Sequence, residues 1–80
     1  ATLIELFSWS EEEFLRRTEG SPIRRIGHER WLRNIAVAMG NALRVGPDPA
    51  MQNALHARAD HPSTIVCEHV AWALAQAQPA

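Results

Sequence analysis

The segment from His28 to Arg44 carries the pattern that most limits how this chain can fold. Placed 100° apart on a helical wheel, its apolar side chains occupy one broad arc of about 160°, as on a helix that faces a core. No segment of the sequence alternates apolar and polar residues with the period of two that a half-buried strand requires. The expected core stripe consists of His28, Trp31, Leu32, Ile35, Ala36, Ala38, Met39, Ala42 and Leu43. We therefore expect an all-α fold built around this helix.

Residues that typically begin and end helices divide the rest of the sequence into short segments. Thr2 and Ser10 are each followed three residues later by a glutamate, which is the capping-box spacing. Trp9 and Phe14 lie where a hydrophobic staple would flank the helix that starts at Glu11. Because the breaks between segments are short, neighbouring helices should be antiparallel, and a small bundle of four to five helices is expected. Further start and stop signals are Gly20, Ser21-Pro22, Gly27, Gly46-Pro47, Asp48-Pro49 and Asp60-His61-Pro62-Ser63.

Two amphipathic segments follow the central helix. The first should run from Asp48-Pro49 to about Ala59, and the second should be capped by Ser63 or Asp60. On the second, Ile65 and Trp72 point away from the main apolar arc and leave a smaller apolar patch, while the Gln/Ala/Pro tail is expected to fray. The residues expected to face inward are Met51, Ala54, Leu55, the stem of Arg58, Val66, Cys67, Val70, Ala73, Leu74 and Ala77.

Length and composition exclude several classes of protein. Eighty residues with 46% hydrophobic and 21% charged side chains suit one small globular domain. A single cysteine makes no internal disulfide and holds no metal cluster alone. The sequence has no apolar run near the roughly 20 residues that span a bilayer and no secretory signal, so we expect no membrane association. Because it does not begin with methionine, we expect a fragment of a longer chain.

The charge is unevenly distributed, although the net charge is only −1. All eight basic residues are arginines. The first 13 residues contain four acids and no base, whereas residues 14–44 contain seven arginines and two acids. Since local charge decides what binds at a surface, this basic middle segment favours an anionic partner. The planar guanidinium also donates two parallel hydrogen bonds to a phosphate.

Five polar residues of the central helix share one arc of about 100°, extending along roughly 20 Å of its length. We call this set the arginine arc; it consists of Arg30, Arg33, Asn34, Asn41 and Arg44, and only Val37 interrupts it. The arc is predicted to contact RNA phosphates together with Arg24 and Arg25. Arg16 and Arg17 are weaker candidates because a helix C-terminus also explains them, and Arg44 also suits its own helix end. The alternative is a solvated face that makes i,i+4 pairs with Glu29 or shields the core, and Asn34 and Asn41 are then ordinary solvated amides.

Three segments together resemble the C-terminal part of the bacterial epoxyqueuosine reductases, which complete queuosine synthesis in tRNA. They are TEGSPIRRIG at residues 18–27, HERWLRNIAVAMGN at residues 28–41 and DHPSTIVCEHVAWAL at residues 60–74. The last segment resembles a HEAT-like repeat of that family. The resemblance covers nearly the whole chain, and its central stretch is the most specific part.

The resemblance implies one helical domain over residues 1–80, with short capping helices in residues 1–27 and HEAT-like helices in residues 28–80. It implies a cytoplasmic parent reductase that uses cobalamin and two 4Fe–4S clusters, with these cofactors held by the preceding catalytic domains. This fragment would bind no cofactor and would grip the tRNA anticodon stem-loop. HEAT-like repeats usually carry arginine where this chain has Cys67, so no role of that arginine transfers.

The remaining residues of chemical interest have simpler explanations. Trp31 could stack on a base, but its wheel position favours the core. Trp72 either docks on the preceding domains or is merely exposed. The four histidines lack metal-ligand spacing, and no catalytic constellation is present, so the fragment alone is expected to be a non-catalytic monomer. The alternative to RNA binding is a helical scaffold that packs on the catalytic domains.

Overall fold

The computed structural model describes residues 2–77 and contains no strand in that range. The all-α prediction is therefore confirmed, as is the expected number of helices. The HEAT-like label and the division at residues 27 and 28 remain predictions, and the predicted fraying of residues 78–80 lies outside the described residues. The elements are α1 (Leu3–Ser8), α2 (Glu11–Arg17), the 3-10 helix η1 (Pro22–Ile26), α3 (Gly27–Val45), α4 (Pro49–His56) and α5 (Thr64–Ala75).

Side-chain caps fix where the helices begin. The Oγ atoms of Thr2 and Ser10 each accept a backbone N–H from the glutamate three residues on, at 3.1 Å. Asp48 accepts from the N–H of Met51, and Ser63 accepts from that of Val66. These bonds satisfy N–H groups that have no partner within the first turn of a helix. The positive φ of Gly27, +83°, lets the chain turn directly from η1 into α3.

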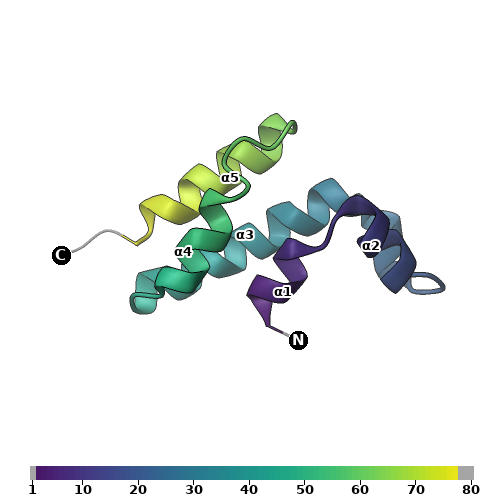
Figure 1. The fold of residues 1–80 in the computed structure, drawn as a ribbon, viewed down its shortest axis with the longest axis horizontal. Coiled ribbons are helices and arrows are strands. Elements are labelled where there is room, and N and C mark those ends of the chain that lie inside the picture. The colour runs from purple at the N-terminus through teal and green to yellow at the C-terminus, as the bar shows by residue number, and fades with distance from the viewer. Residues whose placement is uncertain (1, 78–80) are drawn as a thin grey trace.

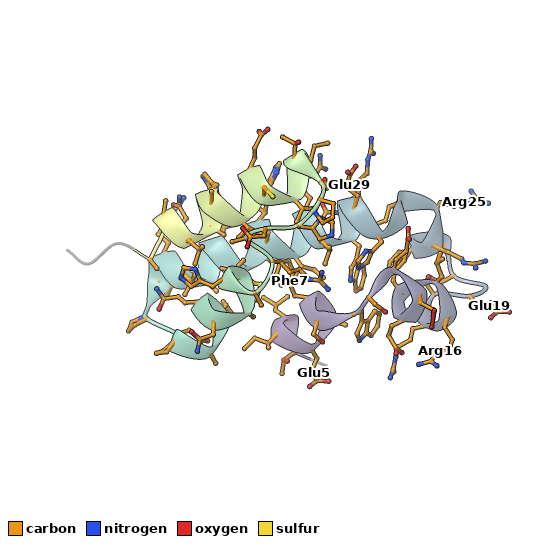
Figure 2. All side chains as sticks on the ribbon, turned by 45° about the horizontal axis from the view of Figure 1, so that its top comes forward. Glu5, Phe7, Arg16, Glu19, Arg25 and Glu29 are labelled. Atoms are coloured by element: carbon orange, nitrogen blue, oxygen red, sulfur yellow. The ribbon has the colours of Figure 1, made fainter. Side chains whose placement is uncertain are left out.

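Helix α3 is the axis of the molecule (Figure 1). It runs alongside α5, and α1 and α4 also pack against it. Phe7 lies near the centre of the molecule in Figure 2 and is 1% exposed. The main core cluster consists of Phe7, Leu32, Ile35, Ala36, Met39, Leu43, Met51, Leu55, Val66, Val70 and Ala73.

The buried stripe of α3 is rotated from the one expected, and one predicted core residue is wrong. Ala42 is exposed, whereas Gly40, which lies outside the predicted stripe, is buried. The reason is that α5 packs closely against the Gly40 edge of α3. A Cβ atom at Gly40 would lie only 2.5 Å from Cζ3 of Trp72. The buried arc therefore extends toward Arg33, which is itself half-buried.

Two side chains hold the C-terminal end of α1 by donating hydrogen bonds to backbone carbonyls there. The indole N–H of Trp31 donates to the carbonyl of Leu6 at 3.1 Å. Arg58 donates to the carbonyls of Phe7 and Trp9 at 2.8 and 3.0 Å. Since the last carbonyls of a helix lack partners within it, these bonds fasten α1 to α3 and to the turn after α4, where Arg58 lies.

His28 and Trp9 complete this junction. Nε2 of His28 lies 2.7 Å from the carbonyl oxygen of Trp9, so this nitrogen donates the proton. The Trp9 ring stacks on Trp31 at a centroid distance of 5.3 Å, and Phe14 contacts Trp31 at 5.2 Å. The two staple residues, Trp9 and Phe14, therefore pack on Trp31. Trp31 is half-buried, which supports a core role for this residue rather than base stacking.

A polar hollow beside this junction contains His61, whose Nδ1 accepts the N–H of Ser63. Burial lowers the pKa of His61, and Arg58 and His28 lower it further, while Glu29 opposes them. As the pH falls through about 6.5, the His61 side chain is therefore protonated in the unfolded chain before it is protonated in the folded chain. The lowered pKa of His61 thus contributes to the free energy of unfolding above about pH 6.5. This contribution is lost as the pH falls through the pKa of His61 in the folded state.

We expect the free energy of unfolding to decrease between pH 7.5 and pH 5, and to decrease less in His61→Asn. Asparagine keeps an oxygen that can accept the N–H of Ser63 but does not titrate. Urea unfolding followed by circular dichroism at several pH values measures both curves. Equal pH dependence in the two proteins would show that His61 is not the source.

Candidate nucleic-acid interface

Three predicted site residues have guanidinium groups with no hydrogen-bond or ion-pair partner among residues 2–77. Arg24 and Arg25 lie on η1, and Arg30 lies at the amino-terminal end of α3. All three are exposed, and none makes an ion pair or a side-chain hydrogen bond within residues 2–77. Figure 2 shows Arg25 projecting from the end of the molecule that α2 and η1 form. Since η1 packs on α3, these arginines lie at one end of the long helix.

The acidic residue best placed to neutralise the arginine arc points elsewhere. Glu29 precedes Arg33 by four residues, the spacing of a helical ion pair. Its carboxylate instead accepts the hydroxyl of Ser63 at 2.6 Å, at the amino-terminal end of α5. Arg33 has only a long contact of 3.5 Å with the side-chain oxygen of Asn34. The i,i+4 pair of the solvated-face alternative is therefore not formed.

The remaining predicted arginines have protein partners. Arg44 donates twice to Oε1 of Gln76, at 3.2 and 2.8 Å, which ties the end of α3 to the end of α5. Arg16 pairs with Glu13 at 2.7 Å, and Arg17 pairs with the same carboxylate at 2.5 Å. These two arginines lower the pKa of Glu13 through hydrogen bonds. Arg16 and Arg17 thus share one carboxylate, whereas Arg24, Arg25 and Arg30 have no acidic partner within residues 2–77.

A shallow hollow lies at the residue that interrupts the arginine arc. Val37 of α3 lines it together with Glu68, His69 and Trp72 of α5. Asn34 and Asn41 lie three residues before and four residues after Val37, so they flank it on the same helix face. Both amides are exposed and available. The arc and the outer face of α5 therefore form one continuous surface.

Comparison with known proteins identifies relatives of this chain. A protein of Alicycliphilus denitrificans named epoxyqueuosine reductase is 64% identical over 78 residues, which cover 92% of this chain. Proteins of the same name from Xanthomonas campestris and Escherichia coli are 63% and 62% identical over 76 residues each, covering 95% and 92% of the chain. The chain is homologous to the epoxyqueuosine reductases. No family model matches it, and no solved structure matches it.

The matched epoxyqueuosine reductases are much longer than this chain. It spans 22%, 21% and 18% of the lengths of these three relatives.

Iron–sulfur clusters are held by cysteine thiolates, four for a 4Fe–4S cluster. This chain has one, Cys67, which is half-buried and whose Sγ contacts the carbonyl oxygen of His61 at 2.9 Å. No helix among residues 2–77 is both long and apolar enough to cross a membrane. The same residues contain no group of three or more metal-ligating side chains. The residues present therefore do not fit a cluster site.

The sequence did not predict that Glu68, His69 and Gln76 belong to this surface. Glu68 and His69 lie outside the apolar arc of α5 and attract no notice alone, and Gln76 lies in the polar tail segment. Only the packing of α5 on α3 brings them beside the arginine arc. The one available signal was Gly40, since a glycine inside a long helix often marks a close approach of another backbone.

Proposed function

We propose that this chain is the C-terminal, tRNA-binding part of an epoxyqueuosine reductase and that it has no catalytic activity alone. Arg24, Arg25, Arg30 and Arg33 bind phosphates of the anticodon stem-loop. Their guanidinium groups position the RNA without reading its sequence. Asn34 and Asn41 donate to phosphate or ribose oxygens beside them, and Arg44, Arg16 and Arg17 contribute less because they already have partners.

The observation that carries this proposal is that Glu29 forms no ion pair with the arginine arc within residues 2–77. An exposed helix face that exists only for solubility would gain from an i,i+4 ion pair at this position. Here the carboxylate is hydrogen-bonded to Ser63, and Arg30 keeps its full donor capacity while Arg33 has only the long contact with Asn34 within residues 2–77. The 62% identity to the Escherichia coli epoxyqueuosine reductase supports the assignment to this enzyme.

The reductase chemistry belongs to the rest of the longer protein. Cobalamin and two 4Fe–4S clusters are bound in its preceding catalytic domains, which also contact this chain, and the protein acts in the cytoplasm. The role of the 80 residues is to hold the anticodon stem-loop near that site as a monomeric module. Proximity of this kind raises the effective concentration of the reacting nucleotide at the catalytic domains.

The salt dependence of RNA binding tests this proposal. The chain is titrated with an anticodon stem-loop at 50–200 mM salt while its amide resonances are followed by NMR. Four phosphate contacts predict a slope of log K against log salt of about −3 to −4. The expected shifts are confined to residues 22–44 and to the α5 residues beside them.

Arginine variants separate RNA binding from a scaffold role. Arg30→Ala should weaken binding to all sequences alike and flatten the slope by about one. Arg16→Ala with Arg17→Ala should change the slope less, because both guanidinium groups already pair with Glu13. The scaffold role would be favoured if the stem-loop did not bind at low salt. It would also be favoured if binding were unchanged in a folded chain in which Arg24, Arg25, Arg30 and Arg33 are all replaced.

A further inference from the structure

The hollow at Val37 is open to solvent and combines apolar with polar surface. Its volume is about 360 Å³, within the usual range for ligand pockets of roughly 300–1,000 Å³. Val37 and the Trp72 ring provide apolar surface, while Glu68 and His69 provide polar atoms. The hollow lies within the arginine arc, so a ligand there would sit among groups that bind phosphate.

Trp72 is held in place from below but remains accessible. Its ring lies against the backbone of α3 at Gly40, where no side chain separates the two helices. The side chain is nevertheless 38% exposed. Its backbone carbonyl accepts the side-chain amide N–H of Gln76, whose Oε1 accepts from Arg44. A guanidinium group is therefore anchored one helical turn from the ring, on the same side of α5.

We propose that this hollow binds one unstacked base of a single-stranded RNA segment, with the base stacked on Trp72. This inference rests on the proposed RNA-binding function and adds a base-binding site to the phosphate contacts. Single-stranded RNA combines the two features that this surface complements, a flat π face and adjacent phosphates. The arginine arc binds the phosphates on either side, and Val37 packs against the edge of the base.

The polar groups of the hollow favour particular bases. Nδ1 of His69 lies 2.8 Å from the carbonyl oxygen of Ile65, so this nitrogen carries the proton and Nε2 of the neutral ring is an acceptor. The carboxylate of Glu68 also only accepts hydrogen bonds. Two acceptors favour a base whose exocyclic amino group offers two N–H donors, as in adenine, cytosine and guanine, over uracil, which offers a single N–H at N3.

The test compares four RNA hexamers that carry the same phosphates. Hexaadenylate, hexacytidylate, hexauridylate and an abasic hexamer are titrated into the 80-residue chain at low salt, after its amide spectrum has shown that it is folded. We expect the adenine and cytosine hexamers to bind more tightly than hexauridylate, and the abasic hexamer to bind most weakly. The indole N–H resonance of Trp72 should shift with the base-containing hexamers only.

Variants assign the effect to the hollow. Trp72→Leu should weaken hexaadenylate binding about tenfold, or roughly 1.4 kcal/mol, and leave the abasic hexamer unchanged. Val37→Phe fills the hollow from α3 without altering Trp72 and should cause a similar loss. Glu68→Gln should reduce the preference for adenine over uracil. Leu15→Ala, on α2 and 37% exposed, is the control and should have no effect.

The outcomes separate this inference from the function on which it rests. Equal binding of hexaadenylate and the abasic hexamer, with an unmoved Trp72 resonance, would overturn the base site and leave the phosphate contacts standing. Binding of neither hexamer would overturn both. Base-dependent binding that survives Trp72→Leu and Val37→Phe would place the base elsewhere and contradict the inference.

Discussion

Replacing Gly40 by valine is expected to destabilise the chain by about 3 kcal/mol, because α5 leaves no space for a side chain there. An added Cβ would lie 2.5 Å from Cζ3 of Trp72 and 2.9 Å from the Cα of Ala73. The second contact is with backbone, so the whole of α5 must move away from α3. Valine has a helix propensity only a few tenths of a kcal/mol better than that of glycine, which does not offset this cost.

Thermal unfolding followed at 222 nm measures the effect. For a domain of this size, 3 kcal/mol corresponds to a decrease in Tm of roughly 12–24 °C. Gly46→Val is the matched control, since Gly46 has extended backbone and no atom within 4 Å of an added Cβ. Adding Trp72→Leu to Gly40→Val should restore part of the loss, because it removes the nearer clash. Equal Tm values for the two valine variants would show that the helices do not pack this closely.

The helices and their starting points were predictable because the signals that determine them are local. Ser10, Asp48 and Ser63 each cap a helix through a backbone N–H only three residues away. The inward positions of Val66 and Val70 also follow from periodicity within α5. Such features depend on spacing along the chain, which the sequence contains in full.

The rotation of α3 and the partners of its charged residues could not be predicted in this way. A helical wheel locates the centre of an apolar arc, but the position of α5 decides which edge is buried. That position determines whether Ala42 or Gly40 faces the core. The hydrogen bonds between Ser63 and Glu29 and between Arg44 and Gln76 join residues more than 30 positions apart. The candidate arginines were therefore predictable, but their freedom from acidic partners was not.

The second large effect is expected at Arg58, where replacement by methionine should destabilise the chain by about 2–4 kcal/mol. The guanidinium group donates to the carbonyls of Phe7 and Trp9, and its Cζ lies 5.6 Å from the centroid of the Phe7 ring. Hydrogen bonds to a charged group contribute about 1.5–3 kcal/mol each, and two bonds from one group do not add fully. Methionine keeps much of the apolar stem, so the loss isolates the guanidinium.

Arg58→Lys and Arg25→Met complete the experiment, with urea unfolding as the measurement. Lysine keeps the charge but lacks the planar fork that reaches two carbonyls 49 and 51 residues away along the chain, so its stability should be intermediate. Arg25→Met removes an exposed arginine without a protein partner and should change stability by no more than about 0.5 kcal/mol. If Arg58→Met were as stable as Arg58→Lys, water would satisfy the two carbonyls equally well. The attachment of α1 to the turn after α4 would then depend on apolar packing around Phe7 alone.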